Sequence, residues 1–212
     1  MKNFIFNKEV LPGKLMAIKE YGKFVTRRTQ GLDEINKEPD KWELTDMFTF
    51  SGRQQVIRKI PLKGINNLTA PNPRYQVGDK VFIREPFRFV QGNGDSYDYA
   101  VVYNDGELKF FCDNAGIMNY PINEKIQSPY SMSEKGARYF GTVTSVRLER
   151  LQEITPEDCV LEGIEKYTFA RGALVENSEP RWKFVKLWNS ISKPPLMWED
   201  NPYTFRYEVE VK

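Results

Sequence analysis

A change from helix to strand is predicted at Gly22-Lys23-Phe24-Val25-Thr26-Arg27-Arg28. Apolar residues precede this stretch at the spacing of one helix face, namely Leu11, Leu15 and Ile18. Gly22 is the residue type that takes the left-handed conformation ending a helix, and β-branched Val25 and Thr26 favour an extended segment. The stretch also places an amine, a hydroxyl and two guanidinium groups close together, so it is a candidate polar site.

The size and composition indicate a globular protein. The chain has 212 residues, of which 40% are hydrophobic and 14% aromatic, so it can bury a sizeable core. We expect residues 1–212 to form a single domain. No apolar run approaches the ~20 residues that cross a bilayer, and Asn7, Lys8 and Glu9 interrupt the short hydrophobic start. A cytoplasmic protein that is not bound to a membrane is therefore expected, in the host cytoplasm if a phage encodes it.

Cysteine and histidine usage limits the chemistry. Cys112 and Cys159 lack metal-ligand spacing and are interpreted as free thiols. Histidine is absent, so a catalytic site would depend on Lys, Glu, Asp, Thr, Ser, Tyr or Cys. Because no acidic metal cluster and no phosphate-binding glycine loop is recognised, we expect neither a metal nor a cofactor.

Charge is distributed unevenly along the chain. Residues 1–90 carry 17 Lys and Arg against 10 Asp and Glu, whereas residues 91–212 carry 14 against 19. The basic half contains the opening stretch and is suited to a partner that carries phosphate, although solvated surface charge explains the same numbers.

Local patterns predict further elements. Strands are expected at QQVIRKIPL, after the turn Gly78-Asp79, on both sides of Asn104-Asp105-Gly106, at 138–150 and at 203–211. Thr155-Pro156-Glu157-Asp158 predicts a helix that Gly163 ends, and RWKFVKLWNSI predicts a second one. The tryptophans at 182, 188 and 198 are interpreted as packing residues. The polar segment 29–50 is predicted to be a surface insertion, as is 86–135. Since strands outnumber helices, an α+β or mainly β fold is expected, with a small barrel flanked by helices.

The order of several motifs resembles that of ASCH domains, a branch of the PUA-like superfamily, in the long form carried by phages and prophages. The matching residues are Gly22-Lys23-x-x-Thr26-Arg27-Arg28, Tyr75-x-Val77-Gly78-Asp79-x-Val81-x-Ile83-Arg84-Glu85, Val143-Thr144-x-Val146 through Ile154, Glu157-Asp158, Glu162-Gly163-Ile164, and Leu187 through Ile191 with Trp198, Asn201 and Pro202. The segment SPYSMSEKGAR departs from the family pattern, in which proline and tryptophan are frequent. The resemblance implies a PUA-like β-barrel with a cleft near the first helix, and RNA or a modified nucleobase or nucleotide as the ligand.

The resemblance also implies a possible catalytic trio. Some bacterial ASCH proteins are acetylcytidine amidohydrolases, hydrolases of a C–N amide bond, and their Lys, Thr and Glu are similar to Lys23, Thr26 and Glu162. Residues three apart on a regular strand face opposite sides, so the amine of Lys23 and the hydroxyl of Thr26 converge only through a turn or a bulge. The alternative is a solvated Lys23, an ordinary strand residue Thr26 and a surface Glu162.

Four more residues are candidate ligand-binding residues: Arg27, Arg28, Arg84 and Glu85. Arg28 shares the Thr26 face and suits bidentate binding of a phosphate, whereas Arg84 and Glu85 have an alternative interpretation as an ion pair at a strand end. Three functions follow: binding of RNA or a modified nucleobase, an amidohydrolase acting on acylated cytidine-like nucleosides, and a phage protein that contacts a host factor through residues 29–50.

Overall fold

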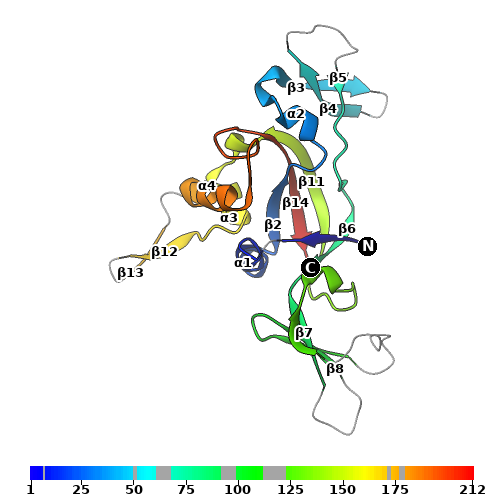
Figure 1. Ribbon diagram of the computed structural model, residues 1–212, viewed down its shortest axis with the longest axis vertical. Helices are drawn as coiled ribbons and strands as arrows, with labels where there is room; N and C mark the ends of the chain where they lie inside the picture. Colours follow the sequence, from blue (N-terminus) through cyan, green and yellow to red (C-terminus); the bar gives the residue numbers. More distant parts are fainter. Residues whose placement is uncertain are drawn as a thin grey trace. The chain divides into compact units, whose positions relative to one another are not determined.

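The computed structural model covers residues 1–212 and describes 1–6, 8–49, 52–60, 68–91, 99–111, 123–170, 173–176 and 180–212 (Figure 1). The chain divides into two compact units. Unit 1 comprises Met1–Leu11, Asp79–Gly141 and Lys212, and unit 2 comprises Pro12–Gly78 and Thr142–Val211. The chain therefore begins in unit 1, builds part of unit 2, returns to each unit once more, and comes back to unit 1 at Lys212.

The protein has an α+β fold in which strands predominate, as the sequence predicted. The helices are α1 (Leu11–Tyr21), α2 (Asp33–Asn36), α3 (Pro156–Leu161) and α4 (Pro180–Ile191). The strands before the middle of the chain are β1 (Lys2–Ile5), β2 (Lys23–Arg28), β3 (Trp42–Thr49), β4 (Gly52–Lys59), β5 (Leu68–Thr69), β6 (Lys80–Arg84) and β7 (Phe87–Gln91). The later strands are β8 (Tyr99–Tyr103), β9 (Leu108–Phe111), β10 (Asn123–Gln127), β11 (Phe140–Arg150), β12 (Tyr167–Ala170), β13 (Ala173–Glu176) and β14 (Tyr203–Val211). No sheet within the described ranges closes on itself, so the expected barrel is not seen there.

The helix-to-strand change predicted at Gly22 is confirmed. α1 ends at Tyr21, Gly22 takes a φ of +65°, and β2 begins at Lys23. β2 pairs antiparallel with β14 in an unbroken register in which Thr26 opposes Tyr207 and Arg27 opposes Arg206. In Figure 1, β2, β14 and β11 run side by side in unit 2. Because the register has no bulge, residues 23, 25 and 27 face one side of β2 and residues 24, 26 and 28 the other.

The start of α3 also forms as predicted. Thr155 is the N-cap, and its Oγ1 accepts a hydrogen bond of 3.1 Å from the main-chain N–H of Asp158. Pro156 occupies the first turn, where the missing N–H costs nothing. Gly163 ends the helix with a φ of +100°. α3 packs on β2, which brings the side chains of Asp158 and Glu162 to that strand.

A contact between two glycines fixes α1 against the end of α3. A Cβ atom on Gly13 would lie 2.2 Å from the carbonyl oxygen of Gly163, and a Cβ on Gly163 would lie 2.4 Å from the carbonyl carbon of Gly13. Only hydrogen atoms on both Cα atoms permit such a close approach. The neighbouring residues, Lys14 and Glu162, are consequently brought into contact.

Unit 1 contains the predicted hairpin. β8 and β9 pair antiparallel, and Gly106 in the turn between them has a φ of +85°. The strand order of this sheet is β10-β7-β8-β9, while β1 and β6 pair in parallel. A compact core forms from Phe82, Phe87, Phe89, Val101, Tyr103, Met132 and Ala137. Each fully buried side chain of this kind contributes about 1.5–3 kcal/mol to stability.

Both segments that the sequence marked as insertions contain buried residues. Leu32 and Ile35 are buried, and the side chain of Asn36 exchanges two hydrogen bonds with the main chain of Tyr203. Within 86–135, Phe87 and Met132 belong to the core of unit 1. The first part of 29–50 is therefore integral to unit 2.

The core beside α4 contains Cys159, which is a buried free thiol as expected, whereas Cys112 lies outside the described residues. Trp188 and Trp198 pack there, also as expected. The prediction that Trp182 is a packing residue was wrong. Its side chain is 53% exposed, and Lys186 one turn later places its ammonium 3.7 Å from the ring centroid.

Candidate functional site

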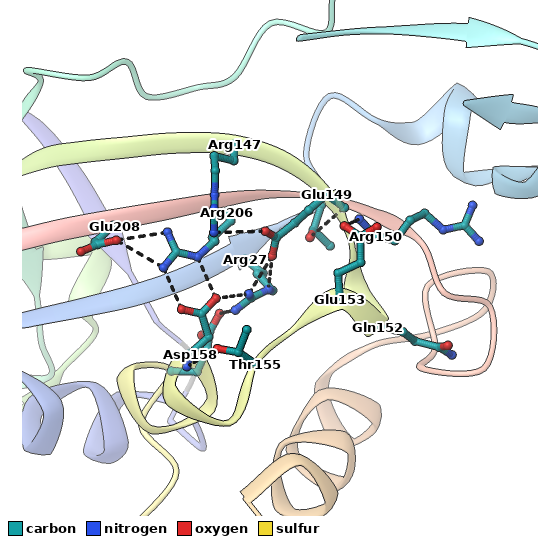
Figure 2. Close-up of polar contacts among 12 residues, drawn as sticks. Arg27, Arg147, Glu149, Arg150, Gln152, Glu153, Thr155, Asp158, Arg206 and Glu208 are labelled. Atoms are coloured by element: carbon teal, nitrogen blue, oxygen red, sulfur yellow. Dashed lines mark hydrogen bonds and ion pairs between the residues drawn. The ribbon is translucent and has the colours of Figure 1, made fainter. Parts of the chain in front are cut away.

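Arg27 is the centre of a buried charge network on the face of β2 that α3 covers (Figure 2). Its Nε donates to Glu149 Oε1 at 2.9 Å, Nη2 lies 2.6 Å from Asp158 Oδ2, and Nη1 lies 3.1 Å from Glu162 Oε1. Burial alone would lower the pKa of Arg27, but the carboxylates of Glu162 and Glu149 outweigh it, and the pKa rises above its ordinary value. The guanidinium is therefore a fixed cation that joins three segments of the chain.

The network continues across β14 towards the surface. Arg206, which opposes Arg27 in the ladder, donates to both oxygens of Asp158 at 2.8 and 2.7 Å and to Glu208 at 3.2 Å (Figure 2). Burial alone would raise the pKa of Asp158, but the bonds from Arg206 and Arg27 lower it to about 2. Lys23 lies at the outer end, with its Nζ 3.6 Å from Glu208 and its side chain 44% exposed.

Lys14 lies at the inner end of the same network. Its side chain is fully buried, and its Nζ donates to Glu162 Oε2 and to the carbonyl oxygen of Val25. Burial lowers the pKa of Lys14 to about 8, against the opposing influence of the Glu162 carboxylate. Since Arg27 binds the other oxygen of Glu162, each oxygen of that carboxylate contacts a cation. Glu162 therefore binds α3 to α1 and β2.

The opposite face of β2 carries Thr26 and Arg28. Thr26 is buried across from Tyr207, and Arg28 is half-buried across from Phe205. Burial lowers the pKa of Arg28 despite the raising influence of Tyr75 and Glu162, and nearby Arg74 lowers it further. On the same face, the rings of Tyr75 and Tyr207 pack edge to face, with their centroids 5.2 Å apart. Cationic and aromatic side chains thus gather here.

A hollow of about 410 Å³ opens on this second face. Its lining consists of Gln55, Pro71, Pro73, Gln76, Val77, Val146, Leu148 and Phe205. Cross-strand partners in an antiparallel pair point to the same face, so Arg28 flanks Phe205 on the side of the hollow. The volume is within the range of sites that hold small molecules.

Gln55 bonds to the strand that borders the hollow. Its Oε1 accepts from the main-chain N–H of Leu148 at 2.9 Å, and its Nε2 donates to the carbonyl oxygen of the same residue at 3.4 Å. The N–H and C=O of one strand residue normally bond to a neighbouring strand. At Leu148 of β11, the side-chain amide of Gln55 from β4 makes these two bonds instead of a neighbouring strand.

Arg84 and Glu85 lie in unit 1, where each has another partner. Glu85 is buried and accepts two hydrogen bonds from Arg138, at 3.0 and 2.7 Å. Burial raises the pKa of Glu85 in spite of that cation. The guanidinium of Arg84 donates to the carbonyl oxygen of Tyr130 at 2.9 Å. In this structure the Glu85 carboxylate is therefore paired with the guanidinium of Arg138.

The structure brings together only some of the residues predicted from the sequence. Arg27 and Glu162 are in contact. Lys23 is linked to them indirectly, through Glu208, Arg206 and Asp158. Thr26 and Arg28 occupy the other face of β2. The amine, hydroxyl and carboxylate of the expected trio are therefore not assembled around one point.

Sequence reasoning missed Lys14, Glu149 and Arg206 as members of the network. Lys14 had a recognisable signal, because it lies three residues after Leu11 and four before Ile18, on the predicted apolar face of α1. A lysine on an apolar helix face must either extend its ammonium to solvent or pair it with an acidic side chain. Glu149 and Arg206 alternate with apolar residues in strands, which is also the pattern of a solvent-exposed face.

Comparison of the chain with family models, with curated proteins and with solved structures finds no match. Within the described ranges, no helix has the length and apolar character needed to span a membrane. In the same part of the chain, acidic and cysteine side chains form no group of three or more that could hold a metal ion.

Proposed function

We propose that the protein binds RNA or a modified nucleobase or nucleotide, and that the base enters the hollow beside Arg28. The observation that carries this proposal is that a hollow of about 410 Å³ opens on the face of β2 and β14 that also carries the half-buried Arg28. Phe205 links the two, because it lines the hollow and opposes Arg28 in the β2–β14 ladder.

The lining suits a flat, partly polar ligand. Val146, Leu148 and Phe205 provide apolar contacts for the faces of a base, and the amide of Gln76 provides a polar group at its edge. Arg28 is placed to bind a phosphate by the charge-assisted, bidentate geometry that guanidinium groups favour. A nucleotide has both a flat, partly polar base for the hollow and a phosphate for Arg28.

We also propose that the chain is an ASCH-type relative with a PUA-like fold. The support is the order of the matching residues along the chain, which begins with Gly22-Lys23-x-x-Thr26-Arg27-Arg28 at β2, continues through Arg84-Glu85 and Glu162-Gly163, and ends before β14. Glycine at 163 has a physical reason in this chain, since the approach of Gly13 leaves no space for a side chain.

An amidohydrolase is the second candidate. It is favoured by the lysine and glutamate in contact at Lys14 and Glu162, because burial holds the pKa of Lys14 at about 8, within the range of a catalytic base. Binding is the preferred function, because Lys14 is fully buried and Lys23 and Thr26 face opposite sides of β2. Contact with a host factor through 29–50 remains a third candidate.

The experiment is a binding assay with a panel of nucleosides and mononucleotides, followed by mass spectrometry of the products. We expect at least one nucleotide to bind and Arg28→Gln to weaken that binding about tenfold or more, since a hydrogen bond to a charged group is worth about 1.5–3 kcal/mol. Arg58→Gln is the matched control, because Arg58 forms an exposed pair with Glu43. Absence of binding by every compound would overturn the proposal, as would equal affinity in the Arg28 variant.

For the host-factor candidate, the test uses substitutions rather than a deletion. Leu32, Ile35 and Asn36 are buried, so removal of 29–50 would damage unit 2 itself. Changing the exposed residues Glu34, Lys37 and Lys41 to serine leaves that core intact. Loss of capture of a host protein, with nucleotide affinity unchanged, would favour this candidate.

A further inference from the structure

The side-chain amide of Gln55 bonds to the main chain of β11 in the way that the edge of a nucleobase could. A primary amide presents a carbonyl acceptor and an N–H donor on one carbon atom. In Gln55 the acceptor meets the N–H of Leu148 and the donor meets its carbonyl oxygen. A ring with the same O=C–N–H group satisfies the same two main-chain groups.

The hollow that holds this contact also has room for a ring. Gln55 and Leu148 both line it, together with the aromatic ring of Phe205. The bond from Gln55 Nε2 to the Leu148 carbonyl is 3.4 Å long, well beyond the usual 2.9–3.0 Å of an N–H···O bond. One of the two bonds that hold Gln55 in place is therefore weak.

We propose that the main chain of Leu148 reads the edge of the bound base, and that the base displaces the Gln55 amide. The base class is one with a carbonyl next to an unsubstituted ring N–H, as in uracil, thymine and guanine. This inference rests on the proposed function, because it specifies how the hollow beside Arg28 recognises its ligand. Modified bases that keep this edge free belong to the same class.

The first test compares uridine monophosphate with its N3-methyl derivative on the wild-type protein by calorimetry. The methyl group removes the donor and leaves the Leu148 carbonyl facing carbon, so we expect affinity to fall about tenfold or more. Equal affinity for the two compounds would overturn the inference while leaving nucleotide binding established. If nucleotides of every base fail to bind, the proposed function itself fails.

The second test is Gln55→Met, which keeps the length of the side chain and removes the amide. Because the variant lacks the internal competitor, we expect it to bind uridine monophosphate several-fold more tightly than the wild type. Weaker binding would show that the amide contacts the ligand instead of yielding to it, which contradicts the proposal. Gln127→Met in unit 1 is the control, and its affinity should equal that of the wild type.

Discussion

Gly13 and Gly163 meet backbone against backbone, and neither position has space for a methyl group. The contact joins α1 to the end of α3 and sets the distance between the residues beside it, Lys14 and Glu162. A steric requirement on two glycines thus determines where a buried ion pair forms.

Replacing Gly163 with alanine should destabilise unit 2. Gly22 is the matched control, because it also has a positive φ but nothing lies within 4 Å of a Cβ there. We expect Gly22→Ala to lower the free energy of unfolding by about 1 kcal/mol from backbone strain alone, and Gly163→Ala to lower it by several kcal/mol. Urea denaturation measures both. Equal losses would mean that α1 moves away from α3 without cost.

Glu162→Gln should be severely destabilising. The change leaves Lys14 without its carboxylate in a fully buried position and removes an ion pair from Arg27. We expect a loss of about 3–5 kcal/mol in the free energy of unfolding, the cost typical of breaking a buried pair. Glu157→Gln on the exposed side of α3 is the control and should change little. A small effect at Glu162 would indicate that Lys14 is not held by this carboxylate.

Acid should remove the contribution of Asp158. Its pKa is lowered from 3.8 to about 2, so its stabilisation is present above pH 3.8 and is lost as the pH falls through about 2. We expect about 2 kcal/mol to disappear over this range, in addition to the losses from other carboxylates. Asp158→Asn should lack this component. Denaturation curves measured between pH 5 and pH 2 give the comparison, and curves of equal slope for both proteins would contradict it.

Alkaline pH should increase the free energy of unfolding through Lys14, whereas acid decreases it through Asp158. The folded protein releases this proton near pH 8, whereas the unfolded chain keeps it up to about 10.5, so between these values the unfolded state binds more protons. The contribution of Lys14 to the free energy of unfolding therefore rises with pH, by up to about 3 kcal/mol. Lys14→Met should lack the rise. Parallel stability profiles of the two proteins from pH 7.5 to 10 would refute the assignment.

Thr26→Ala separates binding from catalysis. We expect nucleotide affinity to stay within about threefold of the wild type, because the bidentate partner is Arg28 and not the hydroxyl. We also expect neither protein to hydrolyse N4-acetylcytidine, which mass spectrometry detects. Turnover by the wild type that the variant loses would instead establish the amidohydrolase.

The sequence correctly predicted the turns, caps and strands that are determined by residues close together in the chain. The turn at Gly106, the cap at Thr155 and the strand β14 depend on neighbouring residues, and each formed as expected, although residues 203–207 of β14 are all buried and do not alternate. The unbroken alternation of β2 also explains why Lys23 and Thr26 separate, which the strand period had indicated. These features required no knowledge of distant contacts.

The rest of the site depends on contacts that no local pattern contains. Lys14 and Glu162 are 148 positions apart, and Arg27 and Asp158 are 131 apart. The hollow combines Gln55 and Gln76 with strand residues far along the chain. Trp182 was misassigned because helical spacing alone does not show which aromatic side chains find a partner.

The wide separation of the network residues also matters during translation. When a ribosome has completed Lys14 and Arg27, the acids at 149, 158 and 162 have not been synthesised, and Arg206 comes later still. These two buried cations therefore stay in contact with water until residue 162 has emerged from the exit tunnel. We expect unit 2 to fold late and to be the part of the nascent chain that needs chaperones most.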